Sequence, residues 1–145
     1  MEQIIDGFLK SDREMVVGEI SDFRGKVYAH LRIMVPSAAE EGEWRRTTKG
    51  VAIEASRVRE LLEGIRRLPG IASAGRVVAS IPVGRDEILV GVDSFRGDAY
   101  AYVRRFYKAG NEWKPTPKGV SVRTEFIDEL IDLAERLATA AGQSD

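Results

Sequence analysis

The sequence predicts an α+β fold built from two tandem β-β-β-β-α units. Two observations predict it. Distinctive residues recur in the same order in both halves of the 145-residue chain, and each half runs from segments of strand-like alternation into a segment of helical spacing. A unit of half this length rarely buries enough apolar surface by itself, so we expect the two units to pack against each other.

The repeat begins at a Phe-Arg-Gly step. Residues 23–29 (FRGKVYA) match residues 95–101 (FRGDAYA), a shift of 72 (95 minus 23), and the arginines at 32 and 104 keep that shift. Glu-Trp-Arg at 43–45 then matches Glu-Trp-Lys at 112–114, and Lys-Gly-Val at 49–51 matches 118–120, a shift of 69 (112 minus 43). The difference of three residues falls in one turn, where a change of loop length costs little.

Each unit is predicted to contain the same elements in the same order. First strands are expected at 15–20 and 87–92, and second strands, after the Phe-Arg-Gly turn, at 26–34 and 98–107. A short third strand is expected around Trp44 and Trp113, and the Lys-Gly steps are expected to turn into a fourth strand. Helices follow, with Ser56 and Thr124 as N-caps.

These elements divide the chain into a first repeat at 13–70, a linker at 71–86 and a second repeat at 87–141. Within the linker, the apolar run from Arg76 to Ile81 could add an extra strand. The segment from Met1 to Asp12 is expected to form a short helix or an arm.

Composition excludes several classes of function. The chain has no cysteine and a single histidine, His30, which excludes disulfides and cysteine- or histidine-rich metal sites. No phosphate-binding loop or nucleophile motif occurs, and Glu40, Glu41 and Glu43 are typical of a solvated turn. We therefore expect no enzyme activity and no cofactor.

The N-terminus does not resemble a signal peptide and no stretch could span a membrane, so an intracellular location is expected, in a bacterial cytoplasm (nucleoid) or a eukaryotic nucleus.

The polar face of each second strand interleaves basic and aromatic residues. On that face lie Lys26, Tyr28, His30 and Arg32 in the first copy, and Tyr100, Tyr102, Arg104 and Phe106 in the second. Basic side chains neutralise phosphates and exposed rings stack on unpaired bases, as single-stranded nucleic acid requires. The net charge is only −1, but acids crowd the second helix instead, so charge is segregated. Ordinary cross-strand pairs are the alternative for this face, and core packing is the alternative for Trp44 and Trp113.

The ordered motifs, ending in Lys-Gly-Val-Ala-Ile at 49–53 and Lys-Gly-Val-Ser-Val at 118–122, resemble the transcriptional coactivator family Positive Cofactor Four. The Whirly and purine-rich-element (Pur) families have similar units, but their motifs fit less well. The resemblance implies paired helices and two curved antiparallel sheets that face single-stranded DNA. The usual form of that family is a homodimer of single units, so this chain would be a covalent pseudo-dimer.

The resemblance also assigns site residues. The ring and basic residue of the turn fall on Phe23 with Arg24 and on Phe95 with Arg96, whereas the basic start of the second strand is Lys26 in one copy and Asp98 in the other. The ring just past that strand is Tyr107, with Val35 in the first copy. Because each copy lacks one expected contact, the resemblance does not predict equal binding by the two halves. Together with the polar faces, the predicted nucleic-acid-binding residues are Phe23, Arg24, Lys26, Tyr28, Arg32, Trp44, Arg45, Lys49, Phe95, Arg96, Tyr100, Arg104, Tyr107, Trp113, Lys114 and Lys118.

The predicted function is sequence-tolerant binding of single-stranded DNA, with RNA as a second ligand of the same class. Transcription regulation, replication and repair are all processes in which such a protein would act. The alternative is a protein-interaction module that docks a transcription or repair partner through the sheet faces or the acidic second helix. Neither function involves a membrane.

Overall fold

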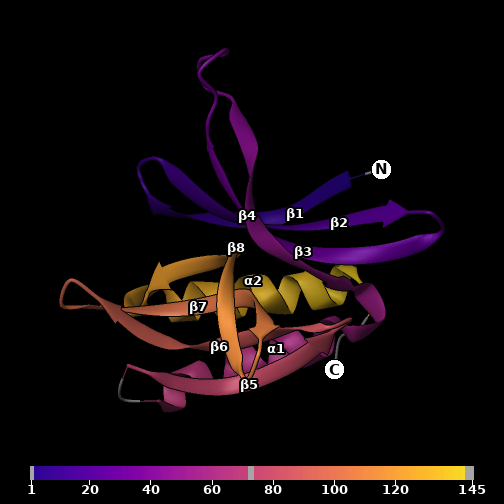
Figure 1. Cartoon of the computed structure of the whole chain (residues 1–145). Coiled ribbons are helices and arrows are strands. Elements are labelled where there is room, and N and C mark those ends of the chain that lie inside the picture. Colours follow the sequence, from indigo (N-terminus) through magenta and orange to yellow (C-terminus); the bar gives the residue numbers. More distant parts are fainter. Residues whose placement is uncertain (1, 72–73, 143–145) are drawn as a thin grey trace.

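The computed structural model describes residues 2–71 and 74–142 and contains two four-stranded antiparallel sheets, each followed by a helix (Figure 1). The first unit comprises β1 (Glu2–Ser11), β2 (Glu14–Phe23), β3 (Lys26–Pro36), β4 (Trp44–Glu54) and α1 (Val58–Arg66). The second comprises β5 (Arg76–Val83), β6 (Asp86–Phe95), β7 (Asp98–Ala109), β8 (Glu112–Arg123) and α2 (Ile127–Ala140). Both sheets are meanders, with neighbouring strands in chain order, which confirms the predicted α+β fold.

The predicted alternation of β3 and β7 is correct. On β3, Ala29, Leu31 and Ile33 are buried in the core while the residues between them are half-buried. On β7, Ala101 and Val103 are buried in the same way. The opposite face of each strand is therefore the outer face of its sheet.

Two predicted strand assignments were wrong. The expected third and fourth strands are one continuous strand in each copy, β4 and β8. Each sheet gains its remaining strand, β1 or β5, from a segment that was expected to be an arm or a linker. Residues 2–11 form β1 rather than a helix or an arm, and the strand foreseen at Arg76–Ile81 is β5.

A threonine in each copy explains why the Lys-Gly step, which was expected to form a turn, lies inside a strand. The β3–β4 register skips at Ile33, where the Thr47 hydroxyl donates to the Ile33 carbonyl oxygen at 2.8 Å and accepts from the Lys49 backbone N–H at 3.1 Å. In the second copy Thr116 makes the same bonds to Arg105 (2.7 Å) and Lys118 (3.1 Å). Each threonine thus satisfies backbone groups that the irregular pairing would leave unpaired.

The helix starts also differ from prediction. Ser56 and Thr124 lie within short 3₁₀ turns, Ala55–Arg57 and Thr124–Phe126, and neither α1 nor α2 has a side-chain N-cap bond. The 3₁₀ turn, rather than a hydroxyl, leads the strand into each helix. Within residues 2–71 and 74–142, no helix is long and apolar enough to cross a membrane.

The two units are interlocked by their helices. The helices contact each other, α2 packs on β1 and β2 of the first sheet, and α1 packs on β5 of the second. Figure 1 shows α2 (yellow) beneath the first sheet (indigo to purple). Phe8 of β1 stacks on Phe126, which precedes α2, with ring centroids 6.0 Å apart, and Arg136 of α2 forms an ion pair with Asp6 of β1.

Glycines allow this close approach. A Cβ atom on Gly18 of β2 would lie 3.2 Å from Leu133 Cδ1 of α2, and one on Gly64 of α1 would lie 2.8 Å from the Ala79 Cβ of β5. Each sheet is therefore covered in part by the helix of the other unit. The chain is the expected intramolecular pseudo-dimer.

Candidate nucleic-acid interface

Both units expose an aromatic ring and an arginine at the hairpin between their second and third strands. The hairpin loops have two residues, Arg24 with Gly25 and Arg96 with Gly97, all with positive φ, as type I′ turns require. A non-glycine residue in this region costs about 1–2 kcal/mol, yet both copies have arginine there. The guanidinium lies over the neighbouring ring, 5.1 Å from the centroid of Phe23 and of Phe95.

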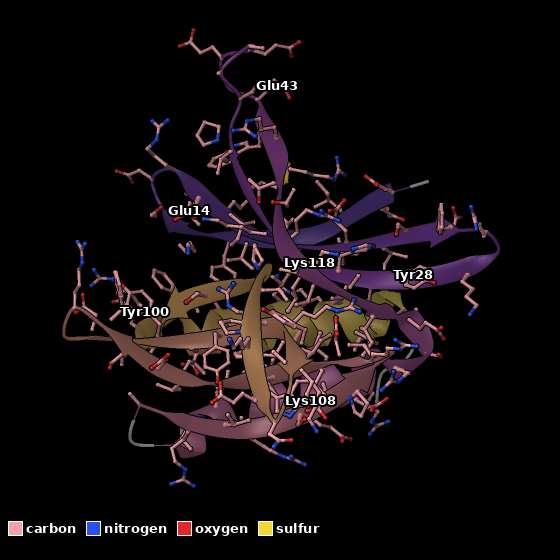
Figure 2. All side chains as sticks on the ribbon, viewed as in Figure 1. Glu14, Tyr28, Glu43, Tyr100, Lys108 and Lys118 are labelled. Atoms are coloured by element: carbon pink, nitrogen blue, oxygen red, sulfur yellow. The ribbon has the colours of Figure 1, made fainter. Side chains whose placement is uncertain are left out.

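These hairpin tips lie far apart. Figure 2 shows Tyr28 and Tyr100, which follow the two turns, on opposite sides of the molecule. Phe23 and Phe95 are 62% and 61% exposed, so each ring is free to stack on a base.

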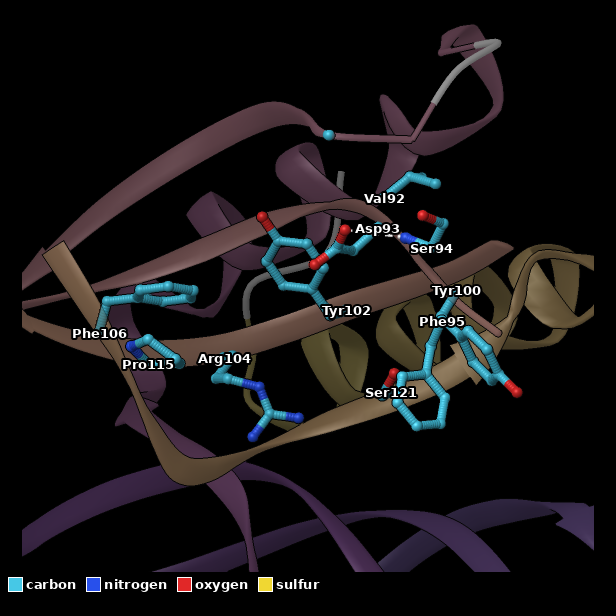
Figure 3. A pocket seen from close by; sticks show the side chains of 11 residues that line it. Val92, Asp93, Ser94, Phe95, Tyr100, Tyr102, Arg104, Phe106, Pro115 and Ser121 are labelled. Carbon is cyan, nitrogen blue, oxygen red and sulfur yellow. Dashed lines mark hydrogen bonds between the residues drawn. The ribbon is translucent and has the colours of Figure 1, made fainter. Parts of the chain in front are cut away.

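The outer face of the second sheet contains an open pocket of about 530 Å³. It is bounded by aromatic side chains of β7 and of the hairpin tip, with one arginine between them (Figure 3). Tyr102 and Phe106 form a tilted pair with centroids 6.2 Å apart. The lining residues are Gly75, Val92, Asp93, Ser94, Phe95, Tyr100, Tyr102, Arg104, Phe106, Pro115 and Ser121.

Arg104 is held in the pocket without a carboxylate partner. Its side chain crosses Gly119 of β8, where a Cβ atom would lie 2.7 Å from Arg104 Cγ, and its Nη1 donates to the Thr116 carbonyl oxygen at 3.0 Å. Among the described residues it forms no ion pair. Partial burial lowers the pKa of Arg104, but arginine remains charged at neutral pH. The pocket therefore offers an uncompensated positive charge.

Tyr102 covers the neighbouring strand in a similar way. A Cβ atom on Gly91 of β6 would lie 2.7 Å from the Tyr102 hydroxyl oxygen, so this ring needs a glycine beneath it. Burial raises the pKa of Tyr102, and the charge of Asp93 raises it further against the opposing effect of Arg104. The phenol is thus neutral at physiological pH.

In the first sheet the corresponding face is closed by an ion cluster. Glu19 stands where the second copy has Gly91, by the shift of 72 (91 minus 19), and it is 1% exposed. It accepts from Arg32 Nε at 2.9 Å and from Arg46 Nη2 at 2.6 Å, and Arg46 also pairs with Glu2 at 3.1 Å. The charge of Arg32 is therefore compensated within the protein.

The same cluster controls the protonation of Glu19. Burial alone would raise its pKa, but the hydrogen bond and charge of Arg46, followed by those of Arg32, lower the pKa below its ordinary value. Glu19 is consequently ionised at neutral pH and holds both arginines.

His30 occupies the position of Tyr102 in the repeat, and both of its ring nitrogens are hydrogen-bonded within the protein. Arg32 Nη2, which can only donate, lies 3.2 Å from His30 Nδ1, so Nδ1 accepts and the proton belongs on Nε2, which donates to Ser21 Oγ at 2.7 Å. Burial and the charge of Arg32 lower the pKa of His30, which favours this neutral form. The first face thus lacks the free arginine and the second ring of its counterpart.

The structure gathers only part of the predicted site. Phe95, Tyr100 and Arg104 line the pocket, and Arg96 lies at its hairpin tip. Lys118 and Arg32 line a smaller pocket of about 290 Å³ between the sheets, where Figure 2 places Lys118 near the centre of the molecule. The other predicted residues do not line the larger pocket: Phe23, Arg24, Lys26, Tyr28, Trp44, Arg45, Lys49, Tyr107, Trp113 and Lys114.

The tryptophans are neither core residues nor part of the pocket. Trp44 is half-buried at the start of β4, and Trp113 is 37% exposed with Lys108 Nζ 5.8 Å from its centroid. Lys26 Nζ forms an ion pair with Glu54 Oε1 at 3.3 Å.

Tyr102 and Phe106 line the pocket but are not among the predicted binding residues, although both lie on the predicted basic-aromatic face. Glu19 and Arg46, which form the ion cluster on the first face, are not among the predicted residues either. A signal was present in the repeat, because a glutamate in one copy aligns with a glycine in the other, directly beside the strand that carries the arginine.

These features define a tandem pair of β-β-β-β-α units with interlocked helices and one open basic-aromatic face. Residues 85–133, from the start of β6 into α2, match the family Transcriptional Coactivator p15 (PC4). A PC4 homolog from Burkholderia pseudomallei, known from its crystal structure, is 23% identical over 43% of this chain and 86% of its own, with a TM-score of 0.37. No curated protein sequence matches the chain.

Proposed function

We propose that this protein binds single-stranded nucleic acid, chiefly DNA, with little dependence on sequence and mainly on the second sheet. The observation that carries the proposal is Arg104, which lies among aromatic rings without a carboxylate partner in the described part of the chain. The match of residues 85–133 to the PC4 family supports it, because that family is known for binding single-stranded DNA.

The aromatic rings and the arginine of the pocket bind different parts of the nucleic acid. Tyr100, Tyr102 and Phe106 offer faces on which unpaired bases stack, at about 1–3 kcal/mol per base. Arg104 neutralises a phosphate or hydrogen-bonds a base edge, and the exposed hairpin tip of Phe95 extends the path by one ring.

The same arrangement selects against duplex. A base reaches an aromatic side chain only with its face free, and in a duplex both faces are covered by neighbouring base pairs. Single strands should therefore bind much more tightly than duplex of the same sequence.

The first sheet contributes less to nucleic-acid binding than the second. Its arginine is paired with buried Glu19, and a nucleic acid phosphate would have to compete with that carboxylate. The exposed tip of Phe23 and Arg24 matches the second copy, as does Tyr28, which stands at the position of Tyr100. On this proposal the protein acts on melted DNA inside the cell, in transcription regulation, replication or repair.

The test is fluorescence anisotropy of a labelled mixed-sequence oligonucleotide of about 20 nucleotides, single-stranded and duplex, in a salt series. The expected result is strong single-strand binding whose log–log salt slope is about −0.7 per phosphate neutralised. Arg104→Ala should weaken it, whereas Arg32→Ala, its counterpart in the first copy, should not. No binding to any single strand at low salt would overturn the proposal and favour a protein-docking role.

A further inference from the structure

We infer that the pocket on the second sheet is a recognition site for one unpaired guanine. This inference rests on the proposed function and adds a base preference at a single position of an otherwise sequence-tolerant strand. Its starting point is the presence of two opposite charges, Arg104 and Asp93, in one aromatic pocket (Figure 3).

Each of the two charged groups is fixed by one hydrogen bond to the backbone and keeps other hydrogen-bonding atoms available. Asp93 Oδ1 accepts from the Ser94 backbone N–H at 2.8 Å, which leaves Oδ2 as a free acceptor. Arg104 donates through Nη1 to a backbone carbonyl and keeps the donors of Nε and Nη2. Within residues 2–71 and 74–142 neither group forms an ion pair, with the other or elsewhere.

Tyr102 lies between these two groups. It is opposite Gly91 in the β6–β7 pairing, while Asp93 is opposite Tyr100 and Leu89 is opposite Arg104. Asp93 and Arg104 thus lie on either side of Tyr102 along the sheet. Consistent with this placement, both charges act on the pKa of Tyr102, in opposite directions. A ring that stacks near Tyr102 would meet an acceptor at one edge and donors at the other.

Guanine matches that pattern better than the other bases. Its O6 and N7 are adjacent acceptors, the pair to which an arginine fork binds. Its N1–H and N2 amino group are adjacent donors on another edge, suited to a carboxylate. Adenine and cytosine offer one amino group, and thymine one ring N–H, so none provides both pairs. The volume of about 530 Å³ lies within the usual range for small-ligand pockets, about 300–1,000 Å³.

The first sheet has no such site. Ser21 stands at the position of Asp93 and is bonded to His30, and Arg32 is paired with Glu19. One chain should therefore bind one guanine at this kind of site.

The experiment compares oligothymidylate of about 20 nucleotides with the same strand carrying one central guanine, adenine or cytosine, by competition anisotropy with the full chain. One guanine should improve affinity by about ten-fold, at the low end of what one good bidentate contact gives, and adenine or cytosine by much less. Hypoxanthine, which lacks the N2 amino group, and 7-deazaguanine, which lacks N7, should each lose most of the gain.

Two variants connect the preference to the named groups. Asp93→Asn should abolish the guanine preference while oligothymidylate still binds, whereas Asp98→Asn, the same charge change at an acid outside this pocket, should leave the preference intact. Arg104→Lys keeps the charge but loses the fork, so it should also remove the preference and leave the salt slope unchanged.

Binding of oligothymidylate without any gain from guanine would overturn the inference and leave the proposed function standing. An equal gain from cytosine, or a guanine preference that survives Asp93→Asn, would overturn it as well. Failure to bind every oligonucleotide would remove both the inference and the proposed function.

Discussion

The side chain of Arg104 lies across Gly119, so closely that a methyl group there would stand 2.7 Å from Arg104 Cγ. In the first copy the close approach is to the backbone of β3 instead, since a Cβ on Gly50 would lie 2.6 Å from the Leu31 carbonyl oxygen and 3.0 Å from the Arg32 Cα. The Lys-Gly step thus lies against the strand arginine in both copies, and in the second copy the arginine side chain lies across it. Its glycine positions the arginine rather than making a turn.

Gly119→Ala should therefore disturb both packing and binding. The added methyl group must displace the Arg104 side chain, and we expect the free energy of unfolding to fall by about 1–3 kcal/mol. Single-strand affinity should fall too, since the guanidinium moves. Urea denaturation and anisotropy measure the two effects. Gly70→Ala is the control, because nothing lies within 4 Å of that position. Unchanged affinity in Gly119→Ala would show that the position of Arg104 does not matter.

Arg104→Ala and Arg32→Ala should have opposite profiles. The first should weaken binding of all sequences and flatten the salt slope by about 0.7, with little loss of stability. The second removes one of two arginines from buried Glu19, so it should lower the free energy of unfolding by about 1.5–3 kcal/mol and spare binding. Salt-series anisotropy and urea denaturation of both variants provide the comparison. Equal losses of affinity would mean that both faces bind.

The two hairpin rings allow a second matched comparison. Phe95 lies at the edge of the pocket and Phe23 beside a closed face, yet the two are exposed to almost the same degree. Phe95→Ala should cost about 1–3 kcal/mol of binding free energy, the value of one base–ring stack, and Phe23→Ala much less. Because both rings are exposed, neither change should lower the melting temperature noticeably. A larger effect at Phe23 would contradict the assignment of the binding face.

Glu19 should make the protein sensitive to acid. Its pKa in the folded state is lowered, so an unfolded chain takes up the proton more readily as pH falls. The stabilisation from its two arginine pairs is therefore complete above the ordinary value of 4.5 and is lost as pH falls through the lower, folded pKa. Urea denaturation between about pH 7 and pH 3 should show Glu19→Gln much less stable at neutral pH, with the difference shrinking in acid. A constant difference would exclude this role.

Neither unit should fold alone. Residues 2–71 lack α2, which packs on β1 and β2, and residues 74–142 lack α1, which packs on β5. We expect each fragment to be largely unfolded by circular dichroism, and an equimolar mixture to regain the native spectrum as a one-to-one complex. A cooperative melting transition in either isolated fragment would show that its unit is independent.

The sequence alone was sufficient to predict the repeat, the fold class and the inward faces of β3 and β7. Period-two alternation and the recurrence of Phe-Arg-Gly depend on local geometry, and they can be read directly from the residues. Strand β1 was missed because Glu2, Gln3 and Asp6 reduce its strand propensity, while its stability comes from packing on α2. The N-caps were wrong for a similar reason, since tertiary packing leads each strand into its helix through a 3₁₀ turn.

The site was harder to predict because it depends on which charges meet. A list of arginines and rings cannot show that Arg32 is compensated and Arg104 is not. That difference arises from Glu19 and Arg46 on neighbouring strands, and from Gly91 and Pro115 at the same positions in the second copy. Comparison of the two copies, position by position, would have pointed to it.

The interlocking of the helices has a consequence for how the two copies can change over generations. If duplication had produced two self-sufficient domains, the copy whose outer face is closed could be deleted without harm to the other. Here its loss would remove α1 from β5 and leave α2 without its partner helix. The second unit thus depends on the inner surface of the first, whereas the outer face of the first can take substitutions that a symmetric homodimer, encoded once, could not make on one side only.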